Sequence, residues 1–218
     1  MKKIMFNDKY ELTKAVLEGR KTITRRAVSM HDYKYGFQVW CDIVSKKYWV
    51  CDGDENDDAN LIVERSQYSK GEVVAIAQSY NKIGLSPSMY CEVPNEYGGT
   101  RDGSFDELPG WENKMFVKSE FMPHHIKITN IRVERLQDIS DKDCLREGVV
   151  KNTIGYYVEG LRCKDWEKES HVEMENGDTL KLFPTPREAF AALIDKVSGK
   201  GTWESNPYVW VYEFELVD

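Results

Sequence analysis

The stretch Gly19-Arg20-Lys21-Thr22-Ile23-Thr24-Arg25-Arg26 places four basic side chains and two threonines directly after a glycine. The preceding segment, residues 8–18, carries apolar residues at helical spacing, with Asp8 and Glu11 placed as a capping box. It therefore predicts a helix. Gly19 suits the position after the last turn, where a left-handed backbone costs little. We expect the basic stretch to leave this helix end as a tight segment.

The rest of the chain predicts short strands and two further helices. One helix is expected at residues 141–147, with Ser140 as its N-cap, and another at residues 186–198, with Thr185 as its N-cap. Alternating or apolar runs predict strands at residues 37–44, 60–64, 72–78, 126–136 (with a bulge) and 208–216. No βαβ alternation is present, so we expect an α+β fold built around a small β-barrel.

We expect one domain over residues 1–218, interrupted by two insertions. Residues 81–112 are rich in Gly, Pro, Ser and Asn, and residues 149–183 mix charges with scattered aromatics. Segments of this length between regular elements are often functional lids.

Several classes of protein are disfavoured by the composition. The longest uninterrupted apolar run, residues 189–194, has six residues, too few for a membrane-spanning helix, and the first residues lack a signal-peptide core. The five cysteines are irregularly spaced without a C-x-x-C, which argues against a disulfide framework or a zinc knuckle. We expect no metal, no cofactor, no membrane partner and a cytoplasmic location.

The charge is distributed unevenly along the chain. The net charge is −7, yet residues 1–26 carry eight basic and three acidic residues, so this segment is at +5 and the remainder at −12. Acidic residues gather at residues 52–58, which we interpret as a solvated loop. An acidic chain of this kind is not expected to coat duplex DNA. Its basic start favours a focused site for an anion.

The basic stretch matches the pattern G-x-K-x-x-T-x-R, and here the chain resembles the ASCH domain of the PUA-like superfamily. The resemblance continues at Lys70-Gly71-Glu72-Val73-Val74, at residues 126–148 and at the closing strand, residues 208–216, so that it covers roughly half of the chain. It implies a small β-barrel with flanking helices, in which the motif lines a cleft. The two insertions have no counterpart in the smallest members.

Within that superfamily, the chain is similar to the short bacterial N(4)-acetylcytidine amidohydrolases. These enzymes use a lysine and a threonine of the motif and a glutamate of the short helix, to which Lys21, Thr24 and Glu147 correspond. Arg26 matches the motif arginine. The resemblance implies Thr24 as nucleophile, Lys21 as base and Glu147 as acid. This chain is twice as long, and its insertions could reshape or close the cleft.

The residue types are consistent with that chemistry. A threonine hydroxyl needs a base within hydrogen-bond reach, and Lys21 can serve only if burial or neighbouring arginines lower its pKa. A helix dipole disfavours a carboxylate in the last turn, so Glu147 could give a proton to a leaving amine. Arg26 could hold an oxyanion.

Plainer interpretations stay open for each of these residues. Thr24 could bond only to the turn backbone, and the basic side chains could simply bind phosphates. Glu147 could form a surface pair with Lys151. Trp111 could stack on a base or cover the mouth of the barrel.

Three functional hypotheses follow. The first is a cleft for a nucleoside, nucleotide or RNA-type ligand, and the second is an amidohydrolase of small N-acylated nucleosides, so that enzymatic activity is left open. The third is a protein-interaction module that uses the insertions. The candidate residues are Lys21, Thr24 and Glu147 for catalysis and Arg25, Arg26 and Trp111 for ligand binding.

Overall fold

The computed structural model describes residues 1–28, 37–42, 44–45, 47–52 and 60–218. Within the predicted acidic loop, residues 52–58, only Asp52 belongs to the described part of the chain.

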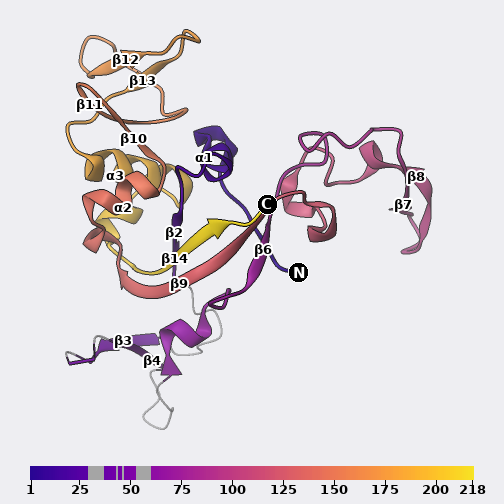
Figure 1. The fold of residues 1–218 in the computed structure, drawn as a ribbon, viewed down its shortest axis with the longest axis horizontal. Coiled ribbons are helices and arrows are strands. Elements are labelled where there is room, and N and C mark those ends of the chain that lie inside the picture. The colour runs from indigo at the N-terminus through magenta and orange to yellow at the C-terminus, as the bar shows by residue number, and fades with distance from the viewer. Residues whose placement is uncertain (29–36, 43, 46, 53–59) are drawn as a thin grey trace.

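A five-stranded sheet forms the centre of the fold (Figure 1). Its order is β1 (Lys3–Ile4), β6 (Val73–Ile76), β9 (His125–Arg135), β14 (Tyr208–Leu216) and β2 (Ile23–Ala27). All neighbours pair antiparallel except β1 and β6, which are parallel. Among the described strands, β1 and β2 do not pair with each other and form the two edges of the sheet. The fold is therefore α+β, and the predicted barrel is not confirmed.

The two longest strands, β9 and β14, contain the predicted bulge. Glu213 lies opposite Asn130, whereas Phe214 lies opposite Ile128, so Thr129 is the additional residue on β9. A bulge of this kind increases the local twist and bends the strand. The bending is visible in Figure 1, where β9 and β14 curve together beneath the helices.

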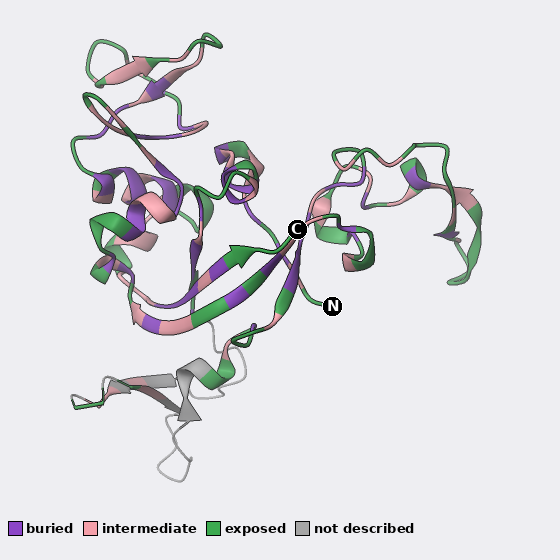
Figure 2. Cartoon of the chain, in the orientation of Figure 1, coloured by how far each residue is buried: buried purple, intermediate pink, exposed green. Residues whose placement is uncertain are grey.

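Two of the three predicted helices are confirmed, each with its predicted cap. In α2 (Asp141–Arg146) the Ser140 side chain accepts a hydrogen bond from the amide of Asp143. In α3 (Pro186–Val197) Thr185 accepts from the amide of Glu188. One face of α3 is buried at residues 190, 193 and 194, where it joins the main core with the buried residues of β14 and β9 (Figure 2).

The first predicted helix is broken. A 3₁₀ turn, η1 (Asp8–Tyr10), is followed by α1 (Leu12–Leu17), and Glu11 between them has a left-handed backbone with φ of 52°. Asn7, rather than Asp8, caps the turn by accepting from the amide of Lys9. Asp8 instead accepts from the Lys114 ammonium at 2.7 Å, which explains why the predicted capping box does not form.

Both predicted insertions contain hairpins. Residues 81–112 include β7 (Tyr90–Pro94) paired with β8 (Thr100–Ser104), which project to one side of the sheet in Figure 1. Residues 149–183 include β10 (Val149–Asn152) with β11 (Gly155–Val158), and β12 (His171–Glu173) with β13 (Thr179–Lys181). The second insertion has its own small cluster of buried apolar residues, whereas the apolar cluster at the first insertion combines Phe105 with residues of β6 and of the segments on either side of the insertion.

The remaining elements are short. The strand predicted at residues 37–44 is β3 (Phe37–Cys41), which pairs with β4 (Tyr48–Asp52). The one predicted at residues 60–64 is only β5 (Asn60–Leu61), followed by η2 (Ile62–Arg65). The other elements are η3 (Phe105–Glu107), η4 (Lys114–Phe116), η5 (Ser119–Phe121), η6 (Leu136–Asp138) and α4 (Thr202–Ser205). None of the helices in the described ranges has the length and apolarity required to span a membrane.

Gly160, directly after β11, fixes the second insertion against η1. Its φ is +69°, and a Cβ built on it would lie 2.0 Å from the carbonyl oxygen of Lys9. We therefore expect Gly160→Ala to lower the free energy of unfolding by at least about 2 kcal/mol, because backbone strain and a clash add together. The matched control is Gly177→Ala, since Gly177 has φ of +84° and open space around it. It should cost about 1 kcal/mol. Equal urea midpoints for the two variants would contradict this account of the contact.

Candidate functional site

A pocket of about 590 Å³ lies at the open side of the sheet, between the chain that follows β1 and the edge strand β2. We call it the central pocket. One wall consists of residues 5–8 and another of residues 24–27. The face of α3 supplies an apolar wall through Phe190, Leu193, Ile194 and Val197. Lys21 and Glu147 line the same pocket, so the motif and the end of α2 meet there as the resemblance implies.

Lys21 is buried at the base of the central pocket. Its Nζ donates to Oε2 of Glu147 at 2.5 Å and to the backbone carbonyls of Ile23 and Glu147, each at 2.9 Å. Burial lowers the pKa of the Lys21 ammonium below its usual value, and the charges of Arg26 and Arg25 lower it further, while Glu147 opposes the change. A lowered pKa is what a role of Lys21 as a general base would require.

Glu147 is held between two cations. Its Oε2 accepts from Lys21, and its Oε1 accepts from Nη1 of Arg25 at 3.1 Å. Arg25 also donates to Glu134 at 2.6 Å and to Asp143 at 3.3 Å. Burial alone would lower the pKa of Arg25, but Glu147 and Glu134 raise it above its usual value. The carboxyl group of Glu147 is therefore held in position from two sides.

The ion pairs continue outward from Arg25. Arg132 on β9 binds Glu134 and Asp143 at 3.0 and 2.7 Å. Arg132 and Arg146 both bind Glu213 on β14, and Arg146 also binds Asp143. Four basic and four acidic side chains thus form one network with no net charge, which we call the ion-pair network; its members are Lys21, Arg25, Arg132, Glu134, Asp143, Arg146, Glu147 and Glu213.

Gly148 lets Glu147 reach Lys21. Its φ is +110°, and a Cβ there would meet the side chain of Leu12 at 3.0 Å and that of Lys21 at 4.0 Å. A glycine at this position ends α2 and brings the chain close against α1. The helix predicted from the sequence ends at residue 147, directly before this glycine. Its close approach to Leu12 depends on a contact between distant segments.

Thr24 and Arg26 line the central pocket without belonging to the network. Thr24 is buried on β2 opposite Tyr212 of β14. Arg26 is exposed, and its Nη2 donates to the carbonyl of Met5 at 2.5 Å, which links the chain after β1 to β2. These two residues carry the polar groups of the motif that can face a ligand.

The other sequence-based assignments have mixed outcomes. The alternative of a surface pair between Glu147 and Lys151 is wrong, because Glu147 is buried and bound to Lys21 and Arg25. Arg25 lines the pocket, although its guanidinium is held by carboxylates. Trp111 packs against the apolar cluster of the first insertion and does not line the central pocket. Its role as a ligand-binding residue stays a prediction.

Several residues of the site were not found from the sequence. Arg132 and Glu134, two members of the ion-pair network, lie on β9, for which the sequence predicts a strand but no site residue. Their spacing of two places both side chains on one face of β9, and two opposite charges at such a spacing in a partly buried strand are a signal of an ion pair. Lys114, from the segment after the first insertion, gave no such signal, yet it lines the pocket and binds Asp8.

The ion-pair network predicts a specific loss of stability in acid. Burial alone would raise the pKa values of Asp143 and Glu213, but the surrounding arginines hold both below their ordinary values of 3.8 and 4.5. Carboxyls with lowered pKa values stabilise the fold above those ordinary values, and this contribution is lost as the pH falls through the lower, folded-state values. Asp143→Asn should therefore unfold more easily at pH 7, by about 1–3 kcal/mol, and show a shallower loss of stability in acid.

The matched control is Asp141→Asn, an exposed carboxyl on the same helix with no ion pair to a described residue. Urea midpoints measured from neutral pH to pH 3 should be almost unchanged for this control. If Asp143→Asn and wild type lose stability in parallel as the pH falls, the assigned ion pairs do not contribute.

The described part of the chain holds no group of three or more His, Cys, Asp or Glu side chains that could bind a metal ion. Comparison with known proteins gave no match to a protein-family model, to a curated protein or to a solved structure.

Proposed function

We propose that the chain is a PUA-like ASCH protein that binds a nucleoside, nucleotide or RNA-type ligand in the central pocket. The observation that carries the proposal is the pairing of an apolar wall on α3 with a fixed polar cluster at Lys21, Arg25 and Glu147. A volume of about 590 Å³ lies within the usual range of small-molecule sites. Apolar walls with a few convergent polar groups are typical of such sites.

A nucleobase is the ligand that fits both parts of the pocket. Its flat faces suit the apolar wall formed by Phe190, Leu193 and Ile194. Its polar edge would meet Thr24, Arg26 and the carboxylate of Glu147. Each carboxylate oxygen can accept more than one hydrogen bond, so Glu147 can accept from an exocyclic amino group as well as from its two cations.

The ASCH assignment accounts for where the pocket lies. In this proposal, the two sheet edges that would close a barrel, β1 and β2, are joined on the pocket side by the side chain of Arg26 and not by a strand ladder. The motif strand and the end of α2 then flank the opening. The order of motif, helix and closing strand along the chain supports the same assignment.

Binding in the central pocket is tested with Thr24→Val, which keeps the shape of a buried side chain and removes its hydroxyl. Loss of one hydrogen bond to a ligand should weaken the binding of cytidine or N(4)-acetylcytidine by about five- to tenfold, as measured by calorimetry. The control is Thr129→Val, the same change at the exposed bulge of β9. Absence of nucleoside binding by wild type, or equal effects of the two variants, would refute the proposal.

A second candidate, hydrolysis of a small N-acylated nucleoside, is favoured by the contact between Lys21 and Glu147. Transfer of one proton across their 2.5 Å hydrogen bond produces a neutral amine and a protonated carboxyl at once. Neutral Lys21 would then take the proton of Thr24 as Oγ attacks the amide carbonyl. Glu147 would give its proton to the departing amine nitrogen as the C–N bond breaks, and water would hydrolyse the acyl-Thr24 ester.

This mechanism predicts a bell-shaped pH profile. The rate should rise as the pH passes the lowered pKa of Lys21 and fall when no proton remains for the leaving amine. Thr24→Val and Lys21→Met should each abolish release of cytidine from N(4)-acetylcytidine, and the double variant should be no worse than either single variant. Thr129→Val is again the control. Release by wild type that does not exceed the Thr24→Val background would rule out hydrolysis and leave ligand binding intact.

A further inference from the structure

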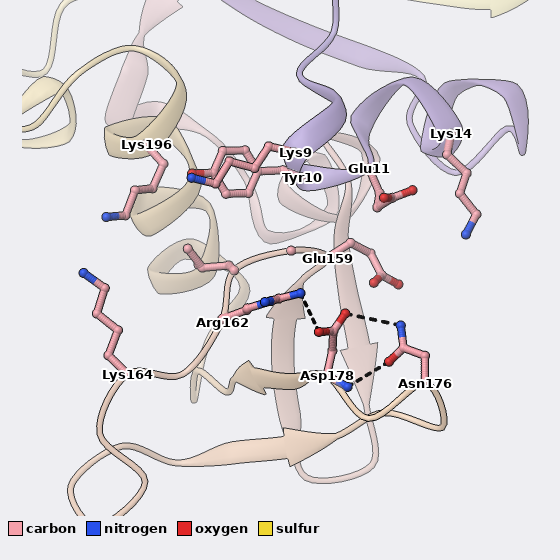
Figure 3. A pocket seen from close by; sticks show the side chains of 12 residues that line it. Lys9, Tyr10, Glu11, Lys14, Glu159, Arg162, Lys164, Asn176, Asp178 and Lys196 are labelled. Carbon is pink, nitrogen blue, oxygen red and sulfur yellow. Dashed lines mark hydrogen bonds and ion pairs between the residues drawn. The ribbon is translucent and has the colours of Figure 1, made fainter. Parts of the chain in front are cut away.

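A second pocket, of about 640 Å³, lies between η1 and α1, the end of α3 and the second insertion (Figure 3). Five basic and three acidic residues line it, on a chain whose net charge is −7. We call it the lysine pocket. Here positive charge from the basic first 26 residues meets positive charge from the second insertion and from α3.

Four of its five cations form no ion pair with a described residue, and one of them, Lys14, lies on the same side as Glu11 in Figure 3, away from the other three. Lys9, Lys164 and Lys196 are exposed and form no ion pair with a described residue, whereas Arg162 is paired with Asp178 at 2.7 Å. Figure 3 shows the ammonium ends of Lys164 and Lys196 pointing toward one another across the opening. Like charges that face each other repel, and a bound anion would remove that cost.

The acidic residues of the pocket do not neutralise these lysines. Asp178 accepts from Arg162 and from the side chain of Asn176. In Figure 3, Glu11 and Glu159 lie on the side of the pocket away from Lys164 and Lys196. The pocket is therefore divided into a basic side and a side that carries the acids.

The lysines are presented by backbone that is held in place. Gly160 lies directly against the carbonyl of Lys9, as its missing Cβ shows. The next residues are tied to β13, because the amide of Lys181 donates to Leu161 and the amide of Cys163 donates to Thr179, each at 2.9 Å. The backbone that carries the lysines is thus held by contacts to η1 and to β13.

The lysine pocket and the central pocket are lined by neighbouring residues at two places in the chain. Asp8 lines the central pocket while the next residue, Lys9, lines the lysine pocket. At the end of α3, Lys196 lines the lysine pocket and Val197 the central one. Neighbouring residues on η1 and at the end of α3 thus line the two pockets, which places the pockets next to each other along these two segments.

We propose that the lysine pocket binds the phosphate groups of single-stranded RNA whose base occupies the central pocket. The proposal rests on the proposed function for the base and extends it to the class of ligand. Three unpaired lysines suit a few phosphates of a flexible strand, and the acidic remainder of the chain disfavours a long duplex. The second insertion supplies one side of the pocket, including Lys164, so this insertion would help to select RNA over a free nucleoside.

The test compares the triple variant Lys9→Ala, Lys164→Ala, Lys196→Ala with a charge-matched control. The control replaces three exposed lysines that line neither pocket: Lys70→Ala, Lys127→Ala, Lys142→Ala. Binding of a single-stranded oligoribonucleotide of about ten nucleotides is followed by fluorescence anisotropy over a range of salt concentrations. Cytidine and inorganic phosphate are tested separately by calorimetry.

The triple variant should bind the oligonucleotide at least about tenfold more weakly in low salt, and its salt slope should fall by about two units. It should bind cytidine as wild type does, and the control should behave as wild type with every probe. If the control loses as much affinity as the triple variant, the effect is one of net charge and the proposal fails. It also fails if wild type does not bind the oligonucleotide.

Two further outcomes separate the sources of the ligand and the two proposals. Loss of phosphate binding in the triple variant with unchanged oligonucleotide affinity would show a site for free phosphate and overturn the RNA assignment. Lysine-dependent oligonucleotide binding without any cytidine binding by wild type would support the lysine pocket and refute the central pocket as a base site.

Discussion

The buried ion pair between Lys21 and Glu147 is the contact on which the arrangement of the site depends. It joins the segment before β2 to the end of α2, and Arg25 extends it to β9. Removing one partner from a buried pair leaves an uncompensated charge and typically costs about 3–5 kcal/mol. Every acid in the ion-pair network binds at least one basic side chain from another element. A different arrangement of these strands and α2 would leave some of the charges without a partner.

This constraint explains how a site can exist at an open sheet edge. An unpaired edge exposes backbone groups that water or another chain can bind. Here the Lys21 ammonium binds the carbonyl of Ile23 on β2, and Arg26 binds the carbonyl of Met5 beyond β1. Side chains of the motif thus satisfy backbone groups that a closed ladder would have paired. The space left between the edges is the central pocket.

Local signals in the sequence were sufficient for the caps of α2 and α3, the bulge in β9 and the closing strand. The resemblance also placed Lys21, Thr24 and Glu147 in one pocket. The break at Glu11 could not be predicted, because it depends on Asp8 binding Lys114 more than a hundred residues away. The outer ion pairs and the lysine pocket likewise require contacts between segments that have no local relation.

The side chains of the motif fall into two groups, because successive side chains of β2 point to opposite faces of the sheet. Lys21 and Arg25 both reach Glu147, and their donors are occupied by carboxylates and carbonyls. Thr24 and Arg26, which alternate with Arg25 along the strand, keep polar groups toward the pocket. A basic stretch therefore does not act here as a set of equivalent phosphate ligands. Its buried cations hold a carboxylate in place, and the residues between and beyond them line the pocket.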